Sequence, residues 1–362
     1  MSCRASVAAS TREQIHVWLL SAYHADSHAA WANWLTATFP SIDWQMLTLP
    51  GRHFAWRIRG NPLSWLDALP ERRPDLIMAT SMVDLATLKG LHPQLHDVPS
   101  WLYFHENQFA YPQSQRQFRS LDPCMVQLYA ALAADRLLFN SRFNRDSFLA
   151  GIEALMQRLP DHQPAGLRAR LESRCDVLPV PVRSIKAGKS RDCRLIVWNH
   201  RWEYDKAPDR FAAAMMALDA LGVDFRVALL GKRSESAPEA LVRIRKQLGH
   251  RIIADGHLPR DEYESLLGRA GIIVSTALHE FQGLSVLEAA SAGARPLVPD
   301  ALCYAEQYPA EYRYRPDDPK ALSEKLQHWL TGTLPPQFRP DDWLVPSLAP
   351  KWKGLINSIE KR

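Results

Sequence analysis

The 362-residue chain lacks any apolar run long enough to cross a bilayer as a helix. Its five cysteines are odd in number and scattered, without the close pairs that typify zinc sites or disulfide frameworks. We therefore expect a cytoplasmic protein that binds no metal. Residues 1–14 contain no apolar core, so we expect no secretory signal there. The net charge of +5 favours an anionic partner only slightly.

Two common nucleotide-binding motifs are also missing. The segment after the first apolar run, residues 21–28, does not contain the G-x-G-x-x-G that lets a helix approach a dinucleotide pyrophosphate. No P-loop is present anywhere in the sequence. These absences argue against a dinucleotide-dependent dehydrogenase and against a P-loop nucleotidase.

Short apolar runs alternate with amphipathic stretches in both halves of the chain. We expect strands at residues 15–20, 44–49, 75–80, 100–104, 136–140, 194–199, 225–231, 252–253, 271–276 and 295–298. We expect helices at residues 29–38, 125–134, 209–221, 238–248, 260–269, 319–330 and 348–361. This alternation predicts the α/β class, with parallel, doubly wound sheets.

The length of the chain indicates two domains rather than one core. A proline-interrupted run at residues 176–182 is followed by a polar, basic stretch at residues 183–191, which is the best candidate for a linker. We expect the first domain over residues 14–185 and the second over residues 190–335.

Two acids with seven residues between them, Glu280 and Glu288, are the most informative feature of the second half. Glu280 follows an expected buried strand, and Glu288 lies in the opening turns of an expected helix, with Gly283 in the turn. Unpaired backbone N–H groups and the helix dipole make such a turn an anion site. A nucleotide sugar fits this combination, because its diphosphate suits the N–H groups and its hydroxyls suit the acids.

A pair of basic residues, Arg201 and Lys206, follows the expected strand at residues 194–199. Ligands of open α/β sheets bind at the carboxyl ends of the strands. Two cations at that edge can hold a diphosphate and stabilise the charge that develops as it leaves. Taken singly, these residues also fit a solvated surface pair, as the two acids do.

Arg201 and Lys206, followed by Glu280 and Glu288, resemble the motif of the retaining glycosyltransferases of the GT-B fold. Residues 103–108, 139–144 and 198–203 are similar to the tRNA-queuosine mannosyltransferases and their bacterial relatives. The resemblance covers nearly the whole chain. It implies two Rossmann-like domains facing across a cleft, with a C-terminal helix at residues 345–362 that crosses back to the N-terminal domain.

The resemblance also implies roles for individual residues. Arg201 and Lys206 would bind the donor diphosphate, and Glu280 would accept hydrogen bonds from the hexose. His105 is the fourth expected catalytic residue, near the sugar. Donor contacts are expected from Asn199, Gln282, Gly283, Leu284 and Glu288, with Ser27 and His28 facing the diphosphate from the other domain. The acceptor side is expected to contain Glu106, Asn107, Asn140 and Ser141.

One departure from the wider fold group concerns Ala25 and Asp26, which stand where many relatives have paired glycines. Asp26 would repel phosphate unless it points at the acceptor. The same region, His24 to His28, has no closing set of metal ligands, and Asp26 or Ser27 is better interpreted as a helix cap.

Some of the predicted site residues have a purely structural alternative. Asn140 and Ser141 fit a cap for the helix that follows them as well as they fit an acceptor role. His105 also fits a polar residue satisfied beneath a loop.

The resemblance implies a retaining transfer in which the leaving diphosphate helps to deprotonate the incoming hydroxyl, while the protein positions the reactants and stabilises charge. The expected donor is GDP-mannose, and the expected acceptor is queuosine in tRNA. Two cations replace the metal ion that other enzymes use, so no metal and no further cofactor are expected. Basic residues that could contact tRNA, or that simply form a solvated basic face, are Arg116, Arg119, Arg142, Arg145, Arg168, Arg170, Arg174, Arg183, Lys186, Lys189 and Arg191.

Three alternatives remain open from the sequence. The first is the same chemistry on a lipid or glycan, for which Trp352 between Lys351 and Lys353 is a hint, provided that the helix is exposed. The second is a nucleotide-sugar epimerase with a cleft closed to large acceptors. The third is a catalytically idle RNA-binding protein, which would tolerate the loss of Glu280 and Lys206.

Overall fold

The computed structural model describes residues 14–111, 120–159, 161–232 and 239–359. Two of the basic residues considered for RNA contact, Arg116 and Arg119, lie outside these ranges. The described chain contains two six-stranded sheets, in which every strand pairing whose register is defined is parallel. No helix in the described ranges is both long and apolar enough to cross a membrane.

The first sheet has the strand order β2-β1-β3-β4-β5-β6. Its strands are β1 (His16–His24), β2 (Asp43–Pro50), β3 (Leu76–Thr80), β4 (Ser100–Phe104), β5 (Arg136–Phe139) and β6 (Cys175–Val177). The accompanying helices are α1 (Asp26–Thr38), α2 (Phe54–Ser64), α3 (Leu85–Leu91), α4 (Asp122–Ala133), α5 (Arg142–Arg158) and α6 (Leu167–Glu172). Strands β3 and β4 are buried along their whole length, as expected of a parallel sheet covered on both faces.

The second sheet has the strand order β12-β11-β10-β7-β8-β9. Its strands are β7 (Asp192–Asn199), β8 (Arg226–Leu230), β9 (Ile252–Gly256), β10 (Ala270–Val274), β11 (Arg295–Pro299) and β12 (Arg313–Tyr314). The helices that follow are α7 (Pro208–Ala220), α8 (Glu239–Leu248), α9 (Arg260–Arg269), α10 (Leu284–Ser291), α11 (Tyr304–Gln307), α12 (Ala321–Thr331) and α13 (Val345–Ile356).

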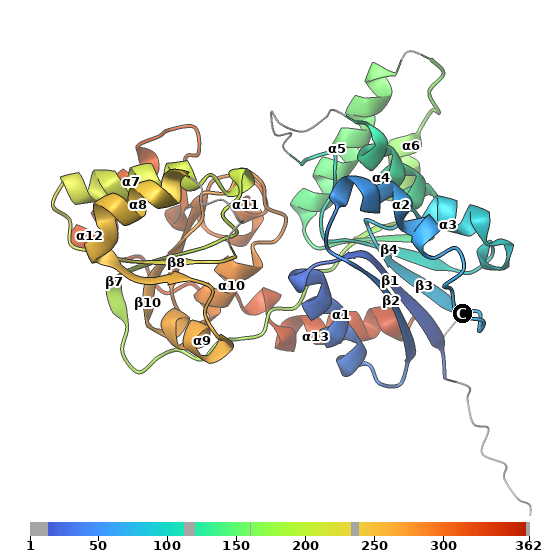
Figure 1. Ribbon diagram of the computed structural model, residues 1–362, viewed down its shortest axis with the longest axis horizontal. Coiled ribbons are helices and arrows are strands. Elements are labelled where there is room, and N and C mark those ends of the chain that lie inside the picture. The colour runs from blue at the N-terminus through green and yellow to red at the C-terminus, as the bar shows by residue number, and fades with distance from the viewer. Residues whose placement is uncertain (1–13, 112–119, 160, 233–238, 360–362) are drawn as a thin grey trace, which may run out of the picture. The chain divides into compact units, whose positions relative to one another are not determined.

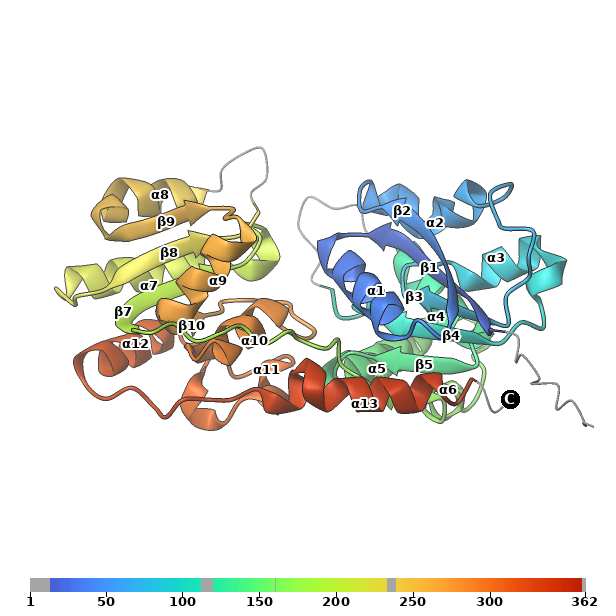
Figure 2. The ribbon, with the colours of Figure 1, turned by 90° about the horizontal axis from the view of Figure 1, so that it is seen from below.

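The second sheet is covered on both faces. Helices α7, α8 and α12 lie on one face and α9 lies on the other (Figure 1). Figure 2 shows strands β9, β8, β7 and β10 side by side in the order of the pairing. The order of this sheet reverses between β7 and β10, because β8 and β9 follow on one side of β7 while β11 and β12 follow on the far side of β10. Such a switch point opens a ligand crevice at the carboxyl ends of the two central strands.

The chain divides into two compact units whose boundaries do not coincide with a single linker. The first contains Met1–Tyr103, Asp122–Leu137 and Leu355–Arg362, and the second contains Phe104–Leu121 and Leu138–Gly354. The end of α13 therefore belongs to the first unit, although most of that helix belongs to the second. The second sheet lies entirely within the second unit.

The start of α1 corrects one sequence prediction. Strand β1 continues to His24, and Ala25 is the N-cap residue, with no side-chain hydrogen bond. Asp26 and Ser27 are therefore not the cap, because the helix already includes both of them. The carboxylate of Asp26 lies in the first turn, where it is favourable next to the helix dipole.

Helix α13, near the C-terminus, corrects a second sequence prediction. The indole of Trp352 is fully buried, and its Nε1 donates a hydrogen bond to the carbonyl oxygen of Pro179 at 3.0 Å. The sequence hint of a lipid-facing tryptophan between Lys351 and Lys353 is therefore wrong, because this side chain packs inside the protein.

Candidate active site

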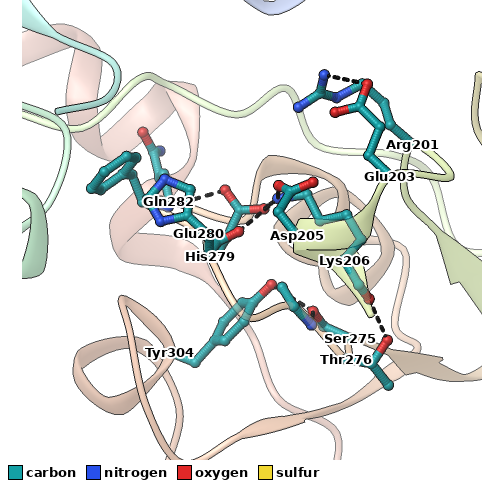
Figure 3. A network of polar contacts seen from close by, with 12 residues as sticks. Arg201, Glu203, Asp205, Lys206, Ser275, Thr276, His279, Glu280, Gln282 and Tyr304 are labelled. Carbon is teal, nitrogen blue, oxygen red and sulfur yellow. Dashed lines mark hydrogen bonds and ion pairs between the residues drawn. The ribbon is translucent and has the colours of Figure 1, made fainter. Parts of the chain in front are cut away.

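Lys206 and Glu280 meet at the switch point of the second sheet (Figure 3). Lys206 follows β7, Glu280 follows β10, and the distance from Lys206 Nζ to Glu280 Oε2 is 3.2 Å. The same ammonium donates to the carbonyl oxygen of His279 at 2.7 Å and lies 3.2 Å from Asp205 Oδ2. The ammonium thus donates hydrogen bonds to one carbonyl oxygen and one carboxylate and forms an ion pair with a second carboxylate.

Hydrogen bonds between the segment that follows β7 and the segment that follows β10 fix the position of Lys206. Thr276 Oγ1 donates to the carbonyl oxygen of Lys206 at 2.7 Å and accepts from Trp198 Nε1 at 3.0 Å. The backbone N–H of Leu278 donates to the carbonyl oxygen of Asp205 at 2.7 Å. Ala207 then turns into α7 with φ of 45°, in the left-handed region. Hydrogen bonds within the protein therefore hold the segments of Lys206 and Glu280 together without a ligand.

Both charges of the Lys206–Glu280 pair are maintained in spite of burial. Burial alone would raise the pKa of Glu280, but the charge of Lys206 and hydrogen bonds to the carboxylate lower it to about 2. Burial alone would lower the pKa of Lys206, but Glu280 and Asp205 raise it above its usual value. The pair is therefore ionised at neutral pH, as a site that binds both phosphate and hydroxyl groups requires.

His200 lies close enough to Lys206, Glu280 and Arg201 for their charges to affect its pKa. Its pKa is lowered to about 3, first by burial and then by the charge of Lys206, while Glu280 and Arg201 also act on it. The imidazole is therefore neutral. A side chain at Gly231 would place Cβ 2.1 Å from the carbonyl oxygen of His200, so glycine is required where β8 ends against this residue.

Arg201 is held by a carboxylate of its own. Its Nη1 lies 2.8 Å from Glu203 Oε1, and both side chains are substantially exposed (Figure 3). The guanidinium also donates a hydrogen bond to the hydroxyl oxygen of Tyr111, in the same compact unit. Exposed pairs of this kind contribute little to stability, so Arg201 can exchange Glu203 for an anionic ligand at small cost.

The turn between Glu280 and α10 directs backbone N–H groups at a carboxylate. Phe281 N–H donates to Glu280 Oε1 at 3.1 Å, and the N–H of Gly283 also acts on this side chain. Gly283 has φ of 65°, and a Cβ there would lie 2.8 Å from Tyr304 Cε1. The expected approach of Gly283 and Leu284 to phosphate therefore starts from a turn already organised around a negative charge.

The side chain of Gln282 has a structural role that the sequence did not predict. Its Oε1 accepts from the backbone N–H of Val180 at 3.0 Å, and its Nε2 donates to the carbonyl oxygen of Val180 at 2.7 Å. Its own carbonyl oxygen accepts from Gln307 Nε2 at 2.7 Å. Gln282 thus anchors the active-site turn to the segment that precedes β7.

Glu288 belongs to a second polar group, which is linked to the first through β7. Tyr263 OH donates to Glu288 Oε2 at 2.7 Å and accepts from Asn199 Nδ2 at 2.8 Å. Arg260 Nη1 lies 3.4 Å from Glu288 Oε1. Asn199 is the last residue of β7 and precedes His200, so the two groups adjoin along the chain.

The residues expected on the acceptor side form a buried network. Asn107 Nδ2 donates to Asn144 Oδ1 at 2.9 Å, and Asn144 Nδ2 donates to Asn140 Oδ1 at 2.8 Å. Ser141 Oγ accepts from the backbone N–H of Asn144 at 3.0 Å, which makes Ser141 the N-cap of α5. The helix-cap interpretation is therefore confirmed for Ser141.

His105 and Glu106 follow β4, and both are partly exposed. The carbonyl oxygen of His105 accepts from Asn140 Nδ2 at 2.8 Å. Burial raises the pKa of Glu106, whereas the charges of Arg201 and Lys206, in the same compact unit, oppose that rise. Of the expected acceptor residues, Glu106 therefore senses the cations of the active site.

Ser27 and His28 belong to the first compact unit. Ser27 is exposed, whereas His28 is buried and its pKa is lowered by burial to about 4. Within the described ranges, no group of three or more His, Cys, Asp or Glu side chains is arranged to hold a metal ion.

Sequence reasoning did not identify Asp205, Tyr263 or His279. Asp205 is next to Lys206 in the sequence, and that position was the available signal. Its burial, with 1% of the residue exposed, is seen only in the folded chain. Tyr263 lies in the first turn of α9, and only the folded chain brings it to Glu288. His279 contributes its carbonyl oxygen, which no side-chain pattern reveals.

Comparisons with known proteins agree with this geometry. Residues 16–182 match the model of the N-terminal region of tRNA-queuosine alpha-mannosyltransferase, and residues 184–339 match that of the group 1 glycosyl transferases. The tRNA-queuosine alpha-mannosyltransferase of Drosophila melanogaster is 31% identical over 367 residues, which cover 94% of this chain and 96% of that protein.

Solved structures of other glycosyltransferases have the same fold as this chain. Sucrose-phosphate synthase from Thermosynechococcus elongatus has a TM-score of 0.71 at 13% identity, covering 96% of this chain and 99% of that one. The apo form of a lipopolysaccharide outer core galactosyltransferase has a TM-score of 0.65 at 12% identity, covering 95% and 99%. The fold confirms the expected pair of Rossmann-like domains, and the similarity to the Drosophila protein runs through nearly all of both sequences. This chain is a GT-B glycosyltransferase and belongs to the tRNA-queuosine alpha-mannosyltransferase family.

Proposed function

We propose that this protein transfers mannose from GDP-mannose to queuosine in tRNA, with retention of the sugar's configuration. The observation that carries this proposal is the 31% identity to a tRNA-queuosine alpha-mannosyltransferase over 94% of the chain. The contact between Lys206 and Glu280 supports it independently, since it places a cation and a hydroxyl acceptor at one switch point.

The donor extends along the carboxyl ends of β7 and β10. Glu280 accepts hydrogen bonds from the hexose, and Lys206 and Arg201 contact the diphosphate. Glu288 accepts hydrogen bonds from the ribose. His200, which interacts with Lys206 and Glu280, is followed back along β7 by Asn199, whose partner Tyr263 contacts Glu288, and this connection supports one donor that reaches both acids.

Donor binding requires Lys206 to exchange contacts. The ammonium contacts the carbonyl oxygen of His279 and the carboxylates of Glu280 and Asp205, so a phosphate oxygen replaces one of the two carboxylates. If the phosphate displaces the Glu280 carboxylate from Lys206, Glu280 becomes free to accept hydrogen bonds from the sugar hydroxyls. The Lys206 ammonium remains charged, because the negative diphosphate replaces the negative carboxylate as its partner.

In the chemical step, the bond between the anomeric carbon and the diphosphate oxygen breaks, and the acceptor oxygen bonds to the same face of that carbon. The acceptor's proton passes to the leaving diphosphate, so GDP is the second product. Arg201 and Lys206 stabilise the charge on the diphosphate as it departs. Loss of one such preorganised cation costs roughly 3–4 kcal/mol in the barrier, or a hundredfold or more in rate.

The acceptor reaches the sugar from the side of His105 and Glu106. Glu106 is the residue there whose ionisation responds to Arg201 and Lys206. The buried network of Asn107, Asn140 and Ser141 supports the loop that carries it. We place the reaction in the cytoplasm, in line with the unpaired state of the described cysteines, namely Cys124, Cys175, Cys193 and Cys303.

The test is a matrix of donors and acceptors with the purified protein. GDP-mannose and UDP-glucose are each incubated with tRNA that contains queuosine and with the same tRNA that contains guanosine at that position. We expect sugar transfer only from GDP-mannose and only to queuosine tRNA, with a loss of at least a hundredfold in Glu280→Gln. Donor hydrolysis without an RNA product would contradict the acceptor, and transfer from UDP-glucose would contradict the donor.

A further inference from the structure

Tyr263 links the last residue of β7 to Glu288 in α10 through its hydroxyl. The hydroxyl accepts a hydrogen bond from Asn199 Nδ2 at 2.8 Å. An amide nitrogen only donates, so the single proton of the hydroxyl is left for Glu288 Oε2, which lies 2.7 Å away. The direction of each hydrogen bond in this chain is thereby fixed.

Glu288 needs such a partner, because its second contact is weak. Arg260 Nη1 lies 3.4 Å from Glu288 Oε1, and the Arg260 side chain is half exposed and also contacts Glu264. An exposed, shared ion pair of this kind orients a carboxylate poorly. A short hydrogen bond from a neutral hydroxyl to a charged oxygen is stronger and more directional.

The Tyr263 hydroxyl also retains its proton under all ordinary conditions. Burial, followed by the charge of Glu288, raises its pKa far above the usual value. The phenol therefore remains a donor to the carboxylate. Glu288 keeps about a quarter of its side chain exposed, so its other lone pairs remain accessible to a ligand.

We propose that Tyr263, oriented by Asn199, is a positioning residue that aims the Glu288 carboxylate at the vicinal hydroxyls of the donor's ribose. The inference rests on the proposed function, because it assigns a task to the nucleotide end of the same site. It also changes the role of Asn199, which acts on the donor through Tyr263 and Glu288.

The experiment measures nucleotide binding without any acceptor. The dissociation constants of GDP, 2′-deoxy-GDP and 3′-deoxy-GDP are determined by calorimetry, together with UDP and its two deoxy analogues. The proteins are the unchanged chain, Tyr263→Phe, and Tyr312→Phe as the matched control. Tyr312 donates its hydroxyl to the carbonyl oxygen of Pro336 at 2.8 Å, so the control loses the same group and a bond of similar length.

We expect the unchanged protein to bind the ribonucleotide at least tenfold more tightly than one of its deoxy analogues, as the loss of a hydrogen bond to a charged group implies. In Tyr263→Phe, we expect ribonucleotide binding to weaken by about tenfold and the preference over that analogue to fall below about threefold. Tyr312→Phe should keep both the affinity and the preference. In transfer assays, Tyr263→Phe should raise the KM for the donor and leave kcat nearly unchanged.

A second variant tests the chain of hydrogen bonds rather than the phenol alone. Asn199→Asp places an acceptor where the amide donates, so the Tyr263 proton is drawn away from Glu288. We expect the same loss of hydroxyl preference as in Tyr263→Phe.

Three results would overturn the inference. They are an unchanged preference in Tyr263→Phe, an equal loss in Tyr312→Phe, and an unchanged protein that shows no preference for either hydroxyl with either base. A full preference seen with UDP and not with GDP would contradict the proposed donor, yet it would support the role of Tyr263.

Discussion

Replacing Lys206 with alanine tests whether its ammonium holds two buried carboxylates in the folded state. Asp205 is 1% exposed, and the Glu280 side chain is 21% exposed. Without Lys206, both acids lose the ammonium that lies 3.2 Å from each of them. Leaving a buried charge uncompensated typically costs 3–5 kcal/mol, and we expect a loss of roughly 4 kcal/mol in the free energy of unfolding for Lys206→Ala.

The pKa of Glu280 gives a second route to the magnitude. It is lowered from 4.5 to about 2 in the folded protein. That shift corresponds to about 3 kcal/mol of stability at neutral pH, an order-of-magnitude figure. Because the folded pKa is the lower one, this contribution is complete above pH 4.5 and is lost as the pH falls towards 2. The stability difference between the unchanged protein and Lys206→Ala should therefore narrow over this interval.

The assay is urea unfolding followed by tryptophan fluorescence, for Lys206→Ala, Glu280→Gln and the double variant. Because the double variant removes both members of the pair, it should cost less than the sum of the single changes by about 2 kcal/mol. Lys353→Ala, at an exposed position of α13, is the control and should change stability by less than about 0.5 kcal/mol. Additive effects, or a loss below about 1 kcal/mol in Lys206→Ala, would refute the reasoning.

Three further substitutions have defined outcomes. Ala207→Gly removes the strain of φ 45° and should raise the urea midpoint by the equivalent of about 0.5–1 kcal/mol; a lower midpoint would count against it. Gly283→Ala adds a clash with Tyr304 at 2.8 Å to its backbone strain, so it should lose about 1–2 kcal/mol more than Gly222→Ala, whose φ of 69° is similar but whose Cβ meets open space; equal losses would show that the ring yields. Asn144→Ala removes the hydrogen bonds that Asn144 Nδ2 donates to Asn140 Oδ1 and to the carbonyl oxygen of Phe104, and should lower stability by about 2–3 kcal/mol, with the activity of the folded fraction unchanged if that network is structural; a large fall in kcat at full stability would indicate a role in transfer.

The two sheets and most of their helices followed from periodicity, because the central strands β3, β4 and β10 are short apolar runs that are buried along their whole length. The expected strand at residues 100–104 and the helix at residues 260–269 match β4 and α9 residue for residue. The ends of the other expected strands differ from the observed ones by one to four residues, because strand ends depend on backbone pairing with the neighbouring strand. Helices α2, α3, α6 and α11 were not predicted: Pro62 and a mostly polar face hide the pattern of α2, and the other three have seven residues or fewer.

The centre of the site followed from topology. Lys206 and Glu280 were expected together because each follows a strand of the second half and because both belong to the motif that resembles the GT-B enzymes, and they are in contact. The hydrogen-bonding partners did not follow from the sequence. Asp205, Tyr263 and the carbonyl oxygen of His279 act through positions that only tertiary packing defines. The side chain of Gln282 was missed for the same reason, since its partner lies 102 residues away in the chain.

The most direct test of the central claim is the structure of the nucleoside product after transfer. Queuosine tRNA is treated with GDP-mannose and the protein, digested to nucleosides and examined by mass spectrometry and NMR. We predict a single hexose on queuosine, linked as the α-mannoside, and no such product from Lys206→Met or Glu280→Gln at equal folded concentration. A β-linked sugar would contradict retention, and an unchanged yield from either variant would contradict the role given to the Lys206–Glu280 pair.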